Sequence, residues 1–259
     1  MNQPNPYPNP YSPPQSPPTQ QQMVTVSLPR TKPYVVYALL AITVGVFLLQ
    51  NLSDYLLGGD ILFAYGAKIN QFILQGQLWR LITPVFLHAS ILHIASNMYG
   101  LFIFGPGLER SYGHWRFVTL YFLAAFAGNV MSFLLTSSPA LGSSTAIFGL
   151  IVAEAAFLYQ NRRILGNRSQ AALGNILIVV LLNLGIGATP GSAIDNWGHV
   201  GGLLGGLVFA WFGGPLWTLE GLPPTVKLVD SRESIHTQLA GFVVLAVFGG
   251  LALLRFIMK

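Results

Sequence analysis

The chain has 259 residues, of which 53% are hydrophobic and only 8% are charged, with a formal net charge of +5. Because soluble domains carry roughly 25% charged residues, this composition excludes a water-soluble globular protein and predicts a polytopic membrane protein. Cysteine is absent, which excludes disulfides, thiolate metal sites and a cysteine nucleophile, and no stripe of basic residues alternates with aromatic ones to suggest a nucleic-acid partner.

The first 33 residues predict a disordered tail. They are rich in Pro, Gln and Asn, and such a composition cannot bury a core but favours polyproline II structure. The segment lacks the positive, apolar and small-residue regions of a cleavable signal. A ligand for an SH3-type domain is the alternative to a simple solvated cytoplasmic tail.

Seven apolar stretches follow, each near the roughly 20 residues that a membrane-spanning helix requires. They predict an all-α polytopic membrane helix bundle, with spans at Tyr34–Leu52, Ser90–Leu108, Arg116–Thr136, Ser144–Gln160, Ala171–Gly187, Trp197–Trp217 and Gln238–Met258. The long loop 53–89 is too apolar for a free linker, so we expect short helices in it. We expect a six-helix membrane domain over 34–217, a cytoplasmic linker over 218–237 and an appended seventh helix over 238–259.

The basic residues predict the direction of these spans. If the N-terminus is cytoplasmic, nine basic residues lie on the cytoplasmic side and four on the outer side. The nine are Arg30, Lys32, Arg110, Arg116, Arg162, Arg163, Arg168, Lys227 and Arg232, and the four are Lys68, Arg80, Arg255 and Lys259. This asymmetry agrees with the positive-inside rule. We therefore expect a multi-pass protein of the plasma (inner) membrane, surrounded by lipid, with an extracytoplasmic C-terminus.

The second, fourth and sixth spans start on the outer side, so polar residues near their starts lie at one depth. These residues are His93 and Asn97 in the second span, Ser144 in the fourth and His199 in the sixth. Polar groups inside a membrane are costly and face the bundle interior or a water-filled cavity. We therefore expect these four side chains to share a cavity that opens to the outer side.

Small residues predict that the fourth and sixth spans approach closely. Gly198, Gly202 and Gly206 recur every four residues in the sixth span, and the fourth span has small residues at helical spacing. A serine needs a neighbouring base to act as a nucleophile, and neutral imidazole suits that role. His93 and Asn97, together with backbone N–H groups at the start of the fourth span, are candidates to bind an oxyanion. Phe148, one turn after Ser144, is placed to pack on the His199 ring.

Each of these residues also has a simpler interpretation. Ser144 is a helix-capping type, as are its neighbours Ser143 and Thr145. Asp195, four residues before His199, can orient the imidazole as a third catalytic member or can cap the helix. His88 is expected to be structural. No sequence pattern predicts a metal or another cofactor, and the oligomeric state is left open.

The motifs together resemble the rhomboid family of intramembrane serine proteases. The resemblance covers about residues 75–215 and rests on Trp79-Arg80, Phe86-Leu87-His88, His93-x-x-x-Asn97, Gly107-Leu108-Glu109-Arg110, Gly142-Ser143-Ser144 and Gly198-His199-Val200-Gly201-Gly202. It implies a Ser144–His199 dyad, oxyanion support from His93 and Asn97, and cleavage of transmembrane protein substrates near the outer interface. It also implies that the fifth span is a lateral gate.

One position departs from the family pattern. Family members often have glycine directly after the nucleophile, whereas this chain has Thr145. A branched side chain there either caps the helix harmlessly or crowds the oxyanion site. This position therefore keeps an alternative function open, that of a catalytically inactive rhomboid-like protein that binds transmembrane clients.

Overall fold

The computed structural model describes residues 31–222 and 226–258, apart from the side chain of Arg168. The predicted tail over residues 1–33 falls almost wholly outside these ranges. Ten α-helices, two short 3-10 helices and one β-hairpin lie within them: α1 (Tyr34–Leu57), α2 (Ile61–Gly66), α3 (Asn70–Leu74), η1 (Leu78–Leu81), η2 (Thr83–Phe86), α4 (Ile91–Tyr112), α5 (His114–Leu135), α6 (Ser144–Gln160), α7 (Arg162–Leu165), α8 (Arg168–Gly187), α9 (Asn196–Gly213), β1 (Trp217–Glu220), β2 (Lys227–Asp230) and α10 (Ser234–Ile257).

The chain is an all-α membrane bundle, as its composition predicts. Within the described ranges, five helices are long and apolar enough to cross a membrane, namely α1, α4, α5, α10 and the part of α8 from Ser169 to Gly187. Of the two remaining long helices, α6 is shorter, with 17 residues, and α9 has many glycines. Both pack against other helices on several sides, so neither needs a wholly apolar, lipid-facing surface.

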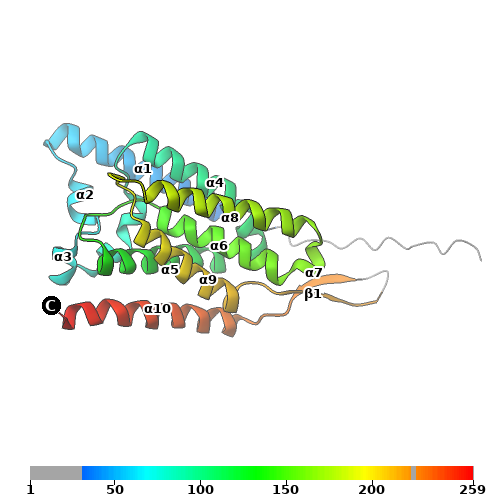
Figure 1. Ribbon diagram of the computed structural model, residues 1–259. Coiled ribbons are helices and arrows are strands. Elements are labelled where there is room, and N and C mark those ends of the chain that lie inside the picture. Colours follow the sequence, from blue (N-terminus) through cyan, green and yellow to red (C-terminus); the bar gives the residue numbers. More distant parts are fainter. Residues whose placement is uncertain (1–30, 223–225, 259) are drawn as a thin grey trace, which may run out of the picture.

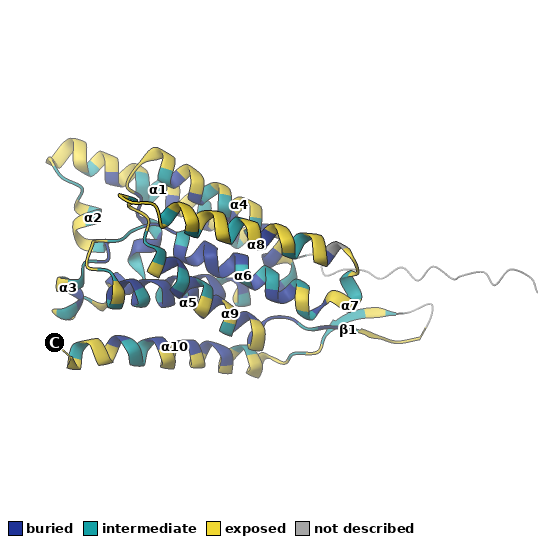
Figure 2. Cartoon of the chain, in the orientation of Figure 1, coloured by how far each residue is buried: buried dark blue, intermediate teal, exposed yellow. Residues whose placement is uncertain are grey.

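The core is built from α5, α6 and α9. These helices pack on one another and carry many of the buried residues, shown dark blue in Figure 2. In contrast, α8 lies on the outside of the bundle and is exposed along most of its length (Figure 2). Since α8 contacts mainly α6, it is the long helix with the least buried surface.

The two ends of the bundle differ (Figure 1). One end, which we call the Ser144 end, holds α2, α3 and the starts of α4, α6 and α9. The other, the hairpin end, holds α7, the β-hairpin and the start of α1. Most described basic residues belong to the hairpin end, namely Lys32, Arg110, Arg116, Arg162, Arg163, Lys227 and Arg232, whereas Lys68, Arg80 and Arg255 belong to the Ser144 end.

Glu109 closes the hairpin end of the bundle between α1, α4 and α5. Its carboxylate is fully buried and accepts hydrogen bonds from the backbone N–H groups of Val35 and Val36, at 2.9 and 2.8 Å. His114 Nδ1 lies 2.6 Å from the same carboxylate. Glu109 therefore caps the first turn of α1, where N–H groups have no partner within the helix.

The segment after α9 differs from the expected linker. Helix α9 ends at Gly213, four residues before the expected end of the sixth span, because Pro215 follows and cannot continue a helix. Trp217 instead begins β1, which pairs antiparallel with β2. Arg116 of α5 binds Asp230 and the carbonyl of Arg232, so the hairpin is attached to the bundle.

Helix α10, the expected seventh helix after the six-helix domain, packs on the bundle along one face. One of its faces, with Ala240, Gly241, Val244, Phe248 and Ala252, is buried, and the helix packs against α5 and α9. Gly213 allows this approach, since a Cβ at this position would lie 3.0 Å from Ala240 Cβ and 3.1 Å from Thr237 Cα. Sequence patterns alone could not show this contact, because the apolar face that meets the bundle resembles one that meets lipid.

Candidate active site

Gly142 brings the chain into α6 in a conformation that other residues rarely adopt. Its φ is +121°, and its N–H donates to Pro84 O at 2.9 Å. A Cβ at this position would lie 2.7 Å from His93 Nε2 and 3.8 Å from Ser144 Oγ. Glycine is therefore required here for both backbone conformation and close approach, and the imidazole of His93 faces the turn before Ser144.

Ser144 and His199 are joined by a hydrogen bond between α6 and α9. The distance from Ser144 Oγ to His199 Nε2 is 2.9 Å. His199 is buried, with 6% of its surface exposed, and Phe148 stacks on its ring with centroids 4.1 Å apart and planes 11° apart. Phe148 thus fixes the plane of the imidazole from the same helix that carries the serine.

Ser144 does not serve as the cap of α6. The N-cap position belongs to Ser143, whose side chain makes no capping hydrogen bond, and Ser144 is the first helical residue. Its hydroxyl is directed to His199. The backbone N–H groups of this first turn lack partners further back in the helix, so they can donate to an anion.

Glycines on α9 allow the two helices to meet. A Cβ on Gly202 would lie 2.1 Å from Thr145 O, and a Cβ on Gly206 would lie 2.5 Å from Gly149 Cα. Both contacts are with backbone atoms, which cannot rotate away as a flexible side chain can. The spacing of small residues in the sequence predicted this approach, and it is what brings Ser144 within reach of His199.

His93 and Asn97 lie beside the turn before Ser144, on α4. Asn97 is buried; its Nδ2 donates to His93 O at 2.8 Å, and its Oδ1 accepts from Ser143 Oγ at 3.2 Å. One of the two Nδ2 hydrogens remains for another acceptor. His93 Nδ1 accepts weakly from Ala89 N at 3.4 Å, which leaves Nε2 facing the Gly142 turn.

His88, expected to be structural, lies among these residues. His88 is buried, its ring contacts the His93 ring edge-on with centroids 5.0 Å apart, and its Nε2 lies 3.5 Å from Ser143 Oγ. Gln50 of α1 accepts from the His88 backbone N–H at 3.0 Å. His88 therefore connects α1 with the turn that leads to Ser144.

The burial of His88 predicts a pH dependence of stability. Desolvation, and secondarily the nearby His93, lowers the pKa of His88 from 6.5 to about 4. Between these values the unfolded chain binds a proton that the folded chain does not, so the free energy of unfolding falls as the pH falls. This one group should account for a loss of about 3 kcal/mol from pH 6.5 to 4.

The measurement is unfolding in detergent micelles across this pH range, with His88→Gln as the comparison. The substituted protein should lose less stability on acidification than the wild type. The same pH slope in both proteins would contradict this assignment.

Thr145 packs away from the turn that faces His93. A Cβ on Gly128 of α5 would lie 2.6 Å from Thr145 Cβ, and a Cβ on Gly198 of α9 would lie 3.2 Å from Thr145 Cγ2. The threonine side chain therefore occupies space that two glycines leave on α5 and α9. The departure from the family pattern at this position adds bulk to a helix interface rather than beside Gly142.

Asp195 caps α9 in this structure. Its Oδ1 accepts from Gly198 N at 3.0 Å and from Thr136 Oγ1 at 3.2 Å. Among the described residues, His199 Nδ1 and Asp195 Oδ2 are buried without a hydrogen-bond partner. Of the two alternatives that the sequence left open, the capping role is the one in which Asp195 is found.

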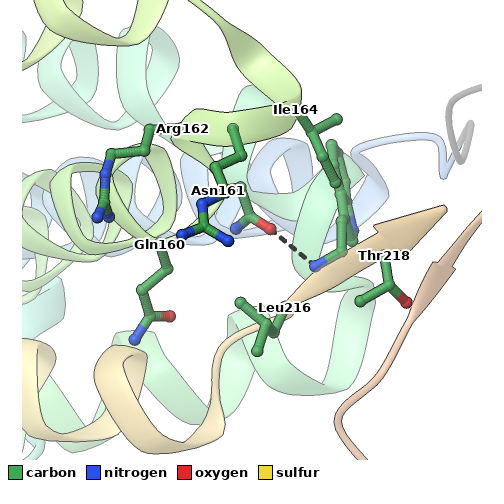
Figure 3. A pocket seen from close by; sticks show the side chains of 8 residues that line it. Gln160, Asn161, Arg162, Ile164, Leu216 and Thr218 are labelled. Carbon is green, nitrogen blue, oxygen red and sulfur yellow. Dashed lines mark hydrogen bonds between the residues drawn. The ribbon is translucent and has the colours of Figure 1, made fainter.

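A pocket of about 390 Å³ lies at the hairpin end, away from these residues. Figure 3 shows its lining, with Arg162 and Ile164 on one side and Leu216 and Thr218 on the other. The dashed line marks the bond from Trp217 N to Asn161 Oδ1, 2.7 Å long, which ties β1 to the end of α6. None of the candidate site residues lines this pocket, and no cluster of three or more His, Asp or Glu suited to a metal occurs in the described part of the chain.

Comparison with known proteins adds a family match to this geometry. The family model described as Rhomboid domain matches residues 75–216. The chain is 38% identical over 180 residues to rhomboid protease GluP of Bacillus subtilis, covering 69% of this chain and 34% of GluP. It is 36% identical over 189 residues to RHOMBOID-like protein 9, chloroplastic, of Arabidopsis thaliana (71% and 43% covered), and 38% identical over 152 residues to Rhomboid-like protease 1 of Toxoplasma gondii (57% and 51% covered). The chain thus spans between about a third and a half of the length of these relatives.

Proposed function

Because the chain belongs to the rhomboid family, we propose that it is an intramembrane serine endopeptidase with Ser144 as nucleophile and His199 as general base. The observation that carries this proposal is the 2.9 Å hydrogen bond between Ser144 Oγ and His199 Nε2 inside the helix bundle. A hydroxyl paired with a neutral imidazole is the arrangement that makes serine nucleophilic. That one relative is named a rhomboid protease agrees with this chemistry.

The reaction follows from the positions of these groups. Ser144 Oγ attacks the carbonyl carbon of the scissile peptide bond while its proton moves to His199 Nε2. The resulting imidazolium gives that proton to the leaving amine nitrogen as the C–N bond breaks, which leaves an ester on Ser144. Water, deprotonated by His199, then attacks the ester and releases the carboxylate product, and Ser144 recovers its proton.

The negative charge on the carbonyl oxygen develops beside three kinds of donor. These are the backbone N–H of Ser144 at the positive end of α6, the Nε2 of His93 when protonated, and the second Nδ2 hydrogen of Asn97. Donors held in place before the reaction stabilise the transition state more than the substrate. Phe148 contributes by holding the His199 ring in its plane.

The proposed substrates are transmembrane segments of other membrane proteins, cleaved near the outer face of the plasma (inner) membrane. The basic residues at the hairpin end support a cytoplasmic N-terminus, an extracytoplasmic C-terminus and a site that opens outward. In this arrangement residues 34–217 form the catalytic membrane domain. The sparsely buried α8 is the candidate lateral gate by family resemblance.

The test uses the full chain reconstituted in lipid with a single-span reporter substrate and, separately, a fluorophosphonate probe. We expect the wild type to cleave the reporter and to bind the probe covalently, and Ser144→Ala to do neither. Ser143→Ala keeps the Ser144 hydroxyl and should still be labelled, which separates the two adjacent serines.

Two results would contradict the proposal. Cleavage that persists in Ser144→Ala would exclude Ser144 as the nucleophile. A folded wild type that neither cleaves nor is labelled, beside an active rhomboid protease under the same conditions, would favour the inactive, client-binding alternative.

A further inference from the structure

Lys68, in the loop between α2 and α3, is a fully buried cation at the Ser144 end. Its Nζ donates to the carbonyl oxygens of Thr136 and Ser138 at 3.0 and 2.9 Å, to Ser132 O at 3.4 Å and to Asn70 Oδ1 at 3.1 Å. Burial lowers the pKa of Lys68 to about 8, while the negative charge of Asp195 acts to raise it. The ammonium is therefore charged at neutral pH. Among the described residues it makes no salt bridge within 4 Å.

The three backbone carbonyls that accept from Lys68 Nζ lie at or just beyond the C-terminal end of α5, which ends at Leu135. The last carbonyls of a helix lack partners within the helix and form the negative end of its dipole. Lys68 Nζ donates to three carbonyls around this end, and Asn70 Nδ2 adds bonds to Phe133 O and Thr136 O at 3.2 and 3.0 Å. Lys68 and Asn70, at the start of α3, therefore cap the C-terminal end of α5 from more than sixty residues away in sequence.

The backbone of the same lysine also binds the segment that leads to the nucleophile. Its backbone N–H and carbonyl pair with Ala140, at 2.9 and 3.0 Å, in an antiparallel bridge. Only three residues separate Ala140 from Ser144, and Gly142 N donates to Pro84 O. Side chain and backbone of Lys68 thus restrain both ends of the short segment 136–140.

A second branch reaches the helix of the general base. Thr136, whose carbonyl accepts from Lys68, donates through Oγ1 to Asp195 Oδ1 at 3.2 Å. The same carboxylate oxygen accepts from Gly198 N, next to His199. The buried polar chain therefore runs from Lys68 through Thr136 to the start of α9.

We propose that Lys68 is a positioning residue for the Ser144–His199 pair. It acts through the end of α5 on two segments, the turn before Ser144 and the start of α9. The part that concerns catalysis rests on the proposed protease function. The chain of contacts itself is independent of that function, so the two can be tested separately.

The experiment compares Lys68→Met, which keeps the length of the side chain but removes the ammonium, with Glu109→Gln. The latter disturbs a buried cap at the opposite end of the bundle and so serves as a control for loss of stability. Each protein is measured for melting temperature, for kcat and KM on the reporter, and for hydrogen exchange of residues 136–144 and 195–199.

We expect Lys68→Met to lower kcat at least tenfold with KM within about twofold, and to speed exchange in both segments. Glu109→Gln should lower the melting temperature but leave kcat and exchange in these segments close to those of the wild type. Thr136→Val, which keeps the carbonyl but removes the bond to Asp195, should speed exchange in 195–199 and lower kcat less than Lys68→Met does.

Unchanged kcat and unchanged exchange in Lys68→Met would overturn the proposal. It would also be overturned if Glu109→Gln, at the same loss of stability, lowered kcat as much as Lys68→Met does. If the wild type has no activity, the protease function fails. The exchange measurement then still decides whether Lys68 orders the two segments.

Discussion

Replacing His199 with alanine should lower kcat for reporter cleavage by about 10⁴-fold or more, because the only base within hydrogen-bond distance of Ser144 Oγ in the described chain is lost. Ser144→Ala should lose the same activity. The double substitution should lose no more than either single one, since a nucleophile and its base act as a unit. The measurement is single-turnover cleavage of the reporter by each purified protein.

The labelling rate with the fluorophosphonate gives an independent check. His199→Ala leaves the Ser144 hydroxyl in place but unactivated, so labelling should be slowed to a similar degree as cleavage. Phe148→Leu, which removes the stacked ring but leaves the dyad, should be intermediate. Additive losses in the double substitution, or normal labelling of His199→Ala, would show that the two residues do not work together.

Replacing Gly202 with alanine should destabilise the folded bundle by about 3 kcal/mol and abolish labelling of Ser144. The added Cβ would lie 2.1 Å from Thr145 O and 2.9 Å from Thr145 C, distances that real Cβ atoms do not adopt. Because these are backbone atoms of the residue next to the nucleophile, relief of the clash must move α6 away from α9. The separation would break the 2.9 Å bond between Ser144 and His199.

Gly250→Ala is the matched control. Gly250 lies within α10, and a Cβ there would have no atom within 4 Å. Since alanine favours a helix over glycine by up to about 1 kcal/mol, this protein should be as stable as the wild type or slightly more so. Equal stability of Gly202→Ala and Gly250→Ala in denaturant or thermal unfolding would contradict the packing argument.

The helices of this protein follow from local sequence properties. Long apolar runs bounded by polar or glycine residues predicted every helix of more than six residues, and the predicted limits of α6 agree with the observed ones, Ser144–Gln160. The same runs predicted that Ser144, His93 and His199 lie near the starts of parallel helices. The prediction of the helices succeeded because the membrane requires each spanning segment to satisfy its own backbone, so a span can be recognised without knowing its neighbours.

Contacts between distant segments escaped this reasoning. From the sequence, Lys68 was interpreted only as a basic residue of an outer loop, although its side chain is buried among carbonyls at the end of α5. For Asp195 the sequence did not decide between a helix cap and a partner of the catalytic histidine. The segment that forms the β-hairpin and binds Arg116 was expected to be a linker. None of these residues has a local pattern that names its partner, since a carbonyl oxygen carries no sequence signature.

By itself the sequence determined the class of protein, the order of its long helices, and which small residues permit close packing, because each of these depends on residues near one another in the chain. The tertiary structure decided which side chains meet. It joined Ser144 to His199, directed Thr145 toward α5 and α9, and bound the start of α9 and the turn before Ser144 to one buried lysine. These pairings depend on differences of a few tenths of an ångström in the separation of the helices, which only the packed bundle defines.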